Sequence, residues 1–483
     1  MTLEQKSALI FDKNKLYGGI KMKTLKKILG VSLAALFVLQ LGFCCIGASA
    51  AQDYKIVSPY ENVVWNGNGA WGAYKGTIHT HTSYSDAGES LSAMVKEYYN
   101  QDYDFLANSD HGITGVEWNK EPEKQLLYSY QELIGNKFEH LTDEEFAAIT
   151  GGTYALYDGQ IRNKKMTCVV GANELNNLSL TKNHVNGYFL APDVGNGFGG
   201  LENEAGYEKA IKFIDDNGGL SHINHPGDWI ESNTNPDAVN DPKNIELFGN
   251  LILKYDSCLG TEVLNEKNGT TGYDRILWDN LLMYCLPYGK TVIGFSNTDA
   301  HSKKTVDSSF SIFMMPENDV ENIKATMQNG AFFAVTRRLR ANDTIGPEED
   351  FDVMNKGLPY PMFSSLTVNG HKITAAVKDT SMIQWIANGK VISKTNVTAD
   401  GTSVTLDLDK IDGAEDFLYV RAELFGEGGL CLSQALVIDN GSTPKAFEEE
   451  DSNIFASLCN MFKGTKICAI FSELGRLIIG MFN

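Results

Sequence analysis

Histidines and carboxylates gather in a few short segments of this 483-residue chain. His79 and His81 stand two residues apart at the end of an apolar stretch, so a β-strand would turn both imidazoles to the same face. Two imidazoles placed in this way can bind one cation. A single His-x-His pair is weak evidence, because most such pairs are ordinary core or surface residues.

Further segments of the same kind follow along the chain, and most of them end an apolar stretch with a histidine or a carboxylate. Of the nine histidines, all but His140 and His371 lie in these segments. Active sites of barrels built from β-α units lie at the carboxyl ends of the strands, so the segments predict one shared site. Mixed imidazole and carboxylate ligands suit Zn²⁺, Mn²⁺ or Fe²⁺ better than Ca²⁺. The segments contain His79 and His81, Asp110 and His111, Glu174, His184, His222 and His225, Glu262 and Asn265, and Asp299 and His301.

The elements that must position these side chains follow an α/β pattern. From about residue 74 to residue 336, short apolar runs alternate with amphipathic stretches, which is typical of repeated β-α units around a parallel sheet. Strands are predicted at residues 75–79, 104–108, 167–171, 219–223, 261–264 and 292–296. Apolar residues spaced three to four apart predict helices at 91–99, 207–215 and 276–283.

The pattern changes after the stretch GPEED at residues 346–350. Alternating strands separated by turn signals such as Asn369-Gly370 predict a small β-sandwich over residues 360–440. Its strands are expected at 364–368, 372–377, 383–387, 402–408, 416–424 and 433–437.

Four ordered blocks, HTHTSYSD, NSDHG, HINHPG and NTDAH, resemble those of the PHP family, which is named for polymerase and histidinol phosphatase domains. Glu174 and His184, which lie between the blocks, also match. The resemblance spans residues 74–336 of a predicted domain at 52–345. It implies a distorted (β/α)7-type barrel, two or three divalent metal ions at the carboxyl ends of its strands, and typically phosphoester hydrolysis.

The resemblance also implies a ligand set. A first metal would be held by His79, His81, Glu174 and Asp299, and Glu174 would bridge to a second metal held with His184 and His225. A third metal would be held by Asp86, His111 and His301. Many relatives have histidine near the position of Asp86, so a binuclear site stays open.

Several neighbouring residues have two interpretations each. Asp110 could orient a metal-activated water or the ligand His111, and His222 could donate a proton to the leaving oxygen; both could equally support the ligands. Glu262 and Asn265 could orient ligands or contact substrate, or make ordinary barrel hydrogen bonds. Arg337 could clamp an anionic oxygen or be a solvated charge.

The function predicted from this set is a metal-dependent phosphoesterase acting on a small, phosphorylated ester. A similarity to the secreted PHP subgroup that includes carbaryl hydrolase keeps a carboxyl-ester or carbamate-ester hydrolase open as an alternative, and a non-catalytic cell-surface binding module is a third. Arg162, Lys303 or Arg337 near the metals would favour a phosphoester. The formal net charge of −20 argues against a nucleic-acid polymer as partner.

The two ends of the chain carry further signals. Basic residues at 21–27, an apolar run at 28–46 and Ala48-Ser49-Ala50 predict a signal peptide at residues 22–50 and export, after an extension at 1–21 with no assigned role. An uncleaved N-terminal membrane anchor is the alternative. Residues 445–483 predict an amphipathic helical tail that packs on its own protein or contacts a membrane surface or partner.

Overall fold

The computed structural model describes residues 54–176, 183–195, 205–265, 272–338 and 357–448. The predicted extension at 1–21, the signal peptide at 22–50 and all of the predicted tail beyond residue 448 lie outside these ranges. Within the described ranges, none of the helices combines the length and the apolar character needed to cross a bilayer.

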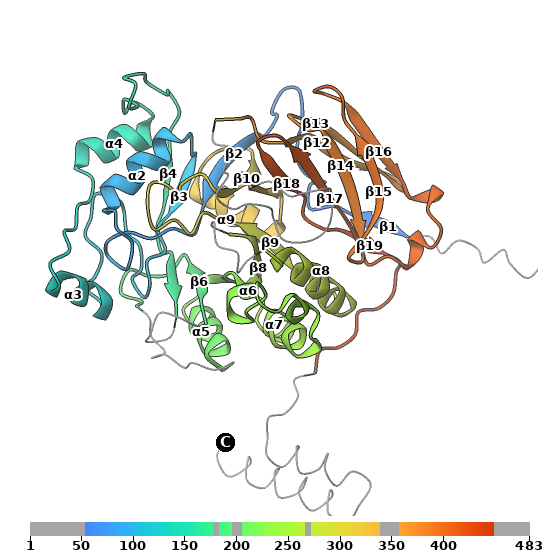
Figure 1. Cartoon of the computed structure of the whole chain (residues 1–483), viewed down its shortest axis with the longest axis horizontal. Coiled ribbons are helices and arrows are strands. Elements are labelled where there is room, and N and C mark those ends of the chain that lie inside the picture. The colour runs from blue at the N-terminus through green and yellow to red at the C-terminus, as the bar shows by residue number, and fades with distance from the viewer. Residues whose placement is uncertain (1–53, 177–182, 196–204, 266–271, 339–356, 449–483) are drawn as a thin grey trace, which may run out of the picture. The chain divides into compact units, whose positions relative to one another are not determined.

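A five-stranded sheet carries half of the predicted site (Figure 1). The last three strands of the sheet pair in parallel, as the β-α pattern predicts, whereas the first three pair antiparallel. Its order is β5 (Asn173–Leu175), β6 (Val185–Tyr188), β7 (Leu220–Ile223), β8 (Cys258–Leu264) and β9 (Ile293–Ser296). The helices that connect these strands are α5 (Ala205–Asp216), α6 (Pro226–Trp229), α7 (Pro242–Lys254) and α8 (Asp274–Cys285).

A second, larger sheet carries the other half of the site. Strands β2 (Gly72–Thr77), β3 (Phe105–Ala107) and β4 (Thr167–Val169) run parallel, while β10 (Ser309–Met315) and β11 (Phe332–Thr336) continue the sheet antiparallel. Gly76 is required here, because a Cβ atom at this position would overlap the ring of Phe105 on the neighbouring strand. The connecting helices are α2 (Leu91–Asn100), α3 (Leu126–Leu133), α4 (Asp143–Gly151) and α9 (Val320–Asn329).

Two isolated parallel bridges join the two sheets. Thr80, after β2, pairs with Ala300, after β9, and His111, after β3, pairs with Glu174 on β5. Each bridge lies within two residues of predicted metal ligands, so the carboxyl ends of β2, β3, β5 and β9 meet at one place. No hydrogen-bonded ladder closes a complete ring among the described strands, so the expected barrel takes the form of two bridged sheets.

The C-terminal strands do not form an isolated layer (Figure 1). Strand β18 pairs with β11, and β1, near the start of the described chain, pairs with β19. The predicted strand at 433–437 is wrong in part, because residues 433–435 connect β18 to β19. One sheet contains β12 (Met362–Asn369), β13 (Lys372–Lys378) and β16 (Ser403–Asp407); the larger sheet gains β1 (Lys55–Val57), β14 (Met382–Ala387), β15 (Lys390–Asn396), β17 (Tyr419–Gly426), β18 (Gly429–Leu432) and β19 (Leu436–Asp439).

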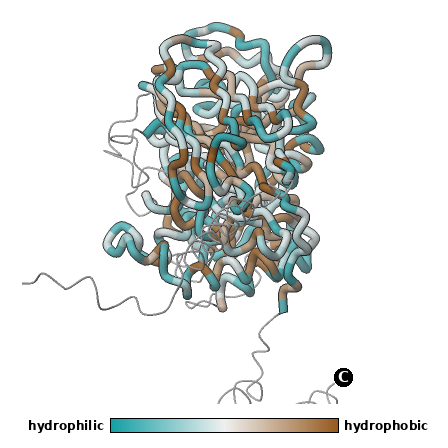
Figure 2. The backbone as a smooth tube through the Cα atoms, turned by 90° about the vertical axis from the view of Figure 1, so that its right-hand side faces the viewer, coloured by the Kyte–Doolittle hydropathy of each residue, from teal (hydrophilic) through white to brown (hydrophobic). Residues whose placement is uncertain are grey.

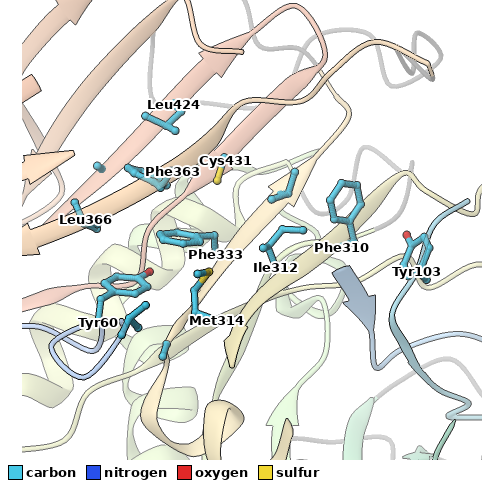
Figure 3. Packing of buried hydrophobic residues seen from close by; sticks show 14 of the residues in the cluster. Tyr60, Tyr103, Phe310, Ile312, Met314, Phe333, Phe363, Leu366, Leu424 and Cys431 are labelled. Atoms are coloured by element: carbon cyan, nitrogen blue, oxygen red, sulfur yellow. The ribbon is translucent and has the colours of Figure 1, made fainter. Parts of the chain in front are cut away.

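Aromatic packing joins the two regions into one core (Figure 3). The ring of Phe333 on β11 stacks between Tyr60 and Phe363, with ring centroids 4.8 and 4.7 Å apart. Such pairs each contribute about 0.5–1.5 kcal/mol beyond the burial of their area. Hydrophobic and hydrophilic stretches alternate along the chain in Figure 2, as expected where strands turn one face to a core. The C-terminal strands therefore help to fix β11 and its neighbour β10, the strand that follows the loop carrying Asp299 and His301.

Candidate metal centre

Most of the predicted ligands lie on loops directly after the strands, whereas Glu174 lies on β5 and His184 directly precedes β6. The backbone N–H of Asp299 donates to the carbonyl of His79 at 3.0 Å, which ties the loop after β9 to the loop after β2. Asp299 and His225 both adopt positive φ angles, of 44° and 21°. Non-glycine residues held in this region are strained by about 1–3 kcal/mol and occur mostly where a functional side chain must be aimed.

The first predicted ligand set converges on one point. Nε2 of His79 lies 3.2 Å from Nε2 of His81, 3.3 Å from Oε2 of Glu174 and 3.2 Å from Oδ1 of Asp299. Nε2 of His81 lies 3.0 and 3.1 Å from the same two oxygens. A regular tetrahedron with edges of this length has its centre about 2 Å from each corner, which is the length of a zinc bond to imidazole or carboxylate. These residues therefore fit a metal ion.

Unpartnered polar atoms support this fit. Oε2 of Glu174, Oδ1 of Asp299 and Nδ1 of His111 are fully buried, and none of them has a hydrogen-bond partner among the described residues. Buried polar groups are normally paired, because an unpaired one costs about 1–3 kcal/mol. Cations bound in this cluster would satisfy these atoms.

The second predicted set uses the other oxygen of Glu174. Oε1 lies 3.1 Å from Nδ1 of His184 and 3.6 Å from Nε2 of His225, and these two imidazole nitrogens are 3.4 Å apart. Oε1 also accepts a hydrogen bond of 2.6 Å from Asn224, a residue that the sequence did not single out although it lies inside the HINHPG block. The two oxygens of Glu174 thus face different histidine pairs, as a bridging carboxylate requires.

The third predicted set lies at the more open side of the cluster. Oδ2 of Asp86 is 3.3 Å from Nε2 of His301 and 3.6 Å from Nε2 of His111, and Oδ1 is 3.7 Å from Nδ1 of His81. The side chains of Asp86 and His301 are 36% and 35% exposed, whereas those of His79 and His81 are fully buried. The structure brings Asp86 into the cluster, and it adds His81 to this set.

The electrostatics of the cluster are those of close, oppositely charged groups. Burial favours the neutral form of His79, but Asp299, Glu262 and Glu174 outweigh it and hold its pKa well above the usual range. Burial likewise opposes the charge of Glu174, yet the surrounding imidazoles hold its pKa well below the ordinary value. Burial lowers the pKa of His111 to about 3, so its imidazole is neutral and able to act as a ligand.

Asp110 and His222, the two predicted catalytic residues, lie behind the ligands. Asp110 accepts hydrogen bonds from the backbone N–H and hydroxyl of Thr82, at 2.7 and 2.8 Å, and from Ser85 at 2.6 Å. Its carboxylate therefore secures the turn that carries Asp86. His222 is fully buried, stacks on Phe295 with centroids 4.6 Å apart, and places Nδ1 3.2 Å from the hydroxyl of Tyr188.

The two predicted substrate contacts have partners of their own. Asn265 donates to Oε2 of Glu262 at 2.6 Å. Arg337 donates from Nε to Asp307 at 2.7 Å and from a terminal nitrogen to the carbonyl of Leu358 at 2.6 Å. These hydrogen bonds give both side chains a structural role within the fold.

Two other positively charged side chains, Arg162 and Lys303, were predicted to favour a phosphoester if they lie near the metals. Arg162 forms ion pairs with Asp102 and Asp104 at 3.1 and 2.8 Å. Lys303 differs, because it lies two residues after His301, is 44% exposed and has Glu89 only at 3.8 Å. Lys303 is thus a cation near the site that can still approach a ligand.

No protein-family model matches the sequence, and no curated protein matches it either. Among solved structures, the chain is similar to a two-domain protein from Bacteroides vulgatus described as containing a predicted PHP-like metal-dependent phosphoesterase, with 14% identity over 78% of this chain and 99% of that one and a TM-score of 0.39. It is also similar to the lesion-specific endonuclease PfuEndoQ from Pyrococcus furiosus, with 13% identity, 53% and 56% coverage and a TM-score of 0.28. The chain spans only about half the length of that enzyme.

The side chains of the four ordered motifs converge on one cluster of possible metal ligands, as the resemblance to the PHP family implies. Neither neighbour's description supports the subgroup that includes carbaryl hydrolase.

Proposed function

We propose that this chain is an exported PHP-type metal-dependent hydrolase, and that it is a phosphoesterase whose substrate is a small phosphorylated ester. The observation that carries the proposal is the position of Glu174, whose two oxygens face different sets of buried imidazoles within 3.6 Å. A carboxylate in this position joins neighbouring cations, and closely spaced cations are the basis of many phosphoester hydrolases.

The residues that would hold the ions are the three sets already described, and Zn²⁺, Mn²⁺ and Fe²⁺ suit their mixture of nitrogen and oxygen. When bound, ions of this kind would supply a water with a pKa of about 7 and would neutralise charge on the substrate oxygens. His79, His81 and Glu174 exclude bulk water from the inner part of the cluster because they are fully buried. Asp86 and His301 form its exposed side, where a substrate enters.

A second candidate is a hydrolase of neutral carboxyl or carbamate esters. Two of the cations that would mark a phosphate-binding pocket, Arg162 and Arg337, are paired with aspartates instead. Lys303 remains for an anionic oxygen, and the phosphoester is preferred on that ground and on the PHP motifs. A non-catalytic binding module would have no use for three buried atoms that lack partners.

Turnover and metal content of the purified protein test the proposal. The protein would be stripped with a chelator, reloaded separately with Zn²⁺, Mn²⁺ or Fe²⁺, and given phosphomonoester, phosphodiester, carboxyl-ester and carbamate substrates. We expect two or three bound ions per chain and hydrolysis of a phosphoester. Faster turnover of a neutral ester would select the second candidate, and no turnover of any of these substrates would select the binding module.

Export is a separate part of the proposal and rests on the signal-peptide pattern at residues 22–50. Expression of the full chain in a bacterium, followed by mass spectrometry of the cell and medium fractions, tests it. A mature N-terminus just after Ala50 is the expected result. An uncleaved chain in the membrane fraction would support the N-terminal anchor instead.

A further inference from the structure

Glu262 lies near the end of β8, is fully buried and accepts hydrogen bonds with both oxygens. Oε1 lies 2.8 Å from Nδ1 of His79 and accepts a bond of 2.9 Å from Asn297. Oε2 accepts bonds of 2.6 Å from Asn265 and 3.0 Å from the backbone N–H of His225. The partners come from four different segments of the chain, so one carboxylate joins the ends of several strands.

The contact with His79 determines which ring nitrogen carries the proton. Both oxygens of Glu262 already accept bonds from N–H donors, Oε1 from Asn297 and Oε2 from Asn265 and the backbone of His225. A carboxylate held among these donors acts as the acceptor, so Nδ1 of His79 is the donor. In the neutral ring, Nε2 then keeps its lone pair, and this is the nitrogen that faces Glu174 and Asp299.

The contact with His225 acts on the backbone. His225 has a φ of 21°, a conformation that needs support from its surroundings. Its N–H is held by Glu262, while its Nε2 faces Oε1 of Glu174 at 3.6 Å and Oδ2 of Asp299 at 3.7 Å. Loss of the bond to Glu262 would allow this loop to relax and would turn the imidazole away from the carboxylates.

We propose that Glu262 is a positioning residue shared by two metal subsites, which holds His79 in the Nδ1–H tautomer and fixes the backbone that aims His225. This inference rests on the proposed metal site, because His79 belongs to its first ligand set and His225 to its second. Carboxylates that orient a ligating histidine in this way typically change metal affinity by about 10–100-fold when they are replaced.

The hydrogen-bond pattern requires a carboxylate rather than an amide. In Glu262→Gln only one acceptor oxygen remains, yet donors approach the group from both sides. If the amide oxygen faces His79, the amide NH₂ opposes Asn265 and the N–H of His225. If it faces His225, the NH₂ opposes His79 and selects the tautomer in which Nε2 is protonated and cannot bind a metal.

The test compares three variants of the full chain. Glu262→Gln keeps the shape and loses the acceptor, Glu262→Asp keeps the carboxylate on a shorter stem, and Glu423→Gln is the matched control. Glu423 is an equally buried glutamate on β17, where it accepts bonds from Gln384 and Arg421 at 2.8 and 2.7 Å. Metal affinity is measured by chelator competition, metal geometry by the visible spectrum of the Co²⁺ form, and folding by the melting temperature of the metal-free protein.

We expect Glu262→Gln to lose about 10–100-fold in affinity at more than one site and to shift the Co²⁺ spectrum, with Glu262→Asp falling between it and the wild type. Glu423→Gln should keep the wild-type affinity and spectrum.

Unchanged affinity and spectrum in Glu262→Gln would overturn the inference. So would loss of cooperative metal-free folding in both Glu262 variants, because Glu262 would then be a structural residue. A wild-type protein that binds metal but hydrolyses nothing would overturn the proposed function and leave this inference standing.

Discussion

Glu174 reaches His81 and His184 with different oxygens, Oε2 lying 3.0 Å from one imidazole and Oε1 lying 3.1 Å from the other. His81 follows β2 and His184 directly precedes β6, and these two strands belong to different sheets. The carboxylate therefore joins the two sheets beside the bridge between His111 and Glu174. The residue proposed to bridge two metal ions is therefore also a residue that links the two sheets.

Replacement of this carboxylate tests the bridge directly. Glu174→Gln should lower turnover about 100-fold or more, because it removes the charge shared by the first two ligand sets. It should also release one or more metal ions. The fold should persist, since the change keeps the volume of the side chain. Metal analysis and the far-UV spectrum of the variant give the measurement, with Glu423→Gln as the buried control. Turnover near that of the wild type would disprove the bridge.

Asp86 decides between a binuclear and a trinuclear site. Its carboxylate lies within 3.7 Å of three imidazoles and is partly exposed, so Asp86→Ala should lower the metal content by one ion and leave the inner ligands in place. Metal content per chain after dialysis gives the result. An unchanged number of ions would show that Asp86 binds no metal and would favour the binuclear interpretation.

Lys303 distinguishes the two candidate substrate classes. If the substrate is a phosphomonoester, Lys303→Gln should lower kcat/KM about 10-fold or more, because a charge-assisted contact contributes about 1.5–3 kcal/mol. Turnover of a neutral ester should not change. Lys304→Gln, at the adjacent exposed lysine, is the control for surface charge. An equal effect of both variants on both substrates would argue against recognition by Lys303.

The sequence predicted much of the site because its signal is local. Apolar runs that lead to His79 and Asp110, and the run that contains Glu262, placed β2, β3 and β8 within a few residues of their observed ends. The edge strand β15 was missed, since its residues are mostly polar and half exposed. The pairing of β18 with β11 could not be predicted, because it depends on contacts between segments about 100 residues apart, which periodicity does not encode.

The ion-pair and hydrogen-bond partners of polar side chains also could not be predicted from the sequence. Arg337 follows an apolar strand, which suggested either an anion clamp or a solvated charge, and the sequence did not predict the ion pair with Asp307 that the structure shows. Asn224 donates to Glu174 and lies between two histidines of a block already identified, so a buried asparagine beside ligand residues was the available signal.

Removal of the metal should lower thermal stability as well as activity. Ligand binding to the folded state stabilises it by about 4 kcal/mol when the free metal exceeds its dissociation constant 1,000-fold. Chelation should therefore lower the melting temperature by several degrees, and readdition of Zn²⁺ or Mn²⁺ should restore it. Calorimetry with and without chelator gives the shift. A melting temperature that is the same in both conditions would mean that the buried cluster holds no metal in solution.

Arg337 provides the last test, because its two interpretations predict different measurements. The guanidinium lies with Lys75 around the buried carboxylate of Asp307, eight residues after Asp299. If this is its role, Arg337→Met should destabilise the fold by about 3 kcal/mol, since it removes one partner of a buried charge. KM for a phosphoester should then stay close to the wild-type value. If Arg337 clamps substrate instead, KM should rise at least 10-fold while the melting temperature stays unchanged. Steady-state kinetics and thermal unfolding of one variant therefore separate the two roles.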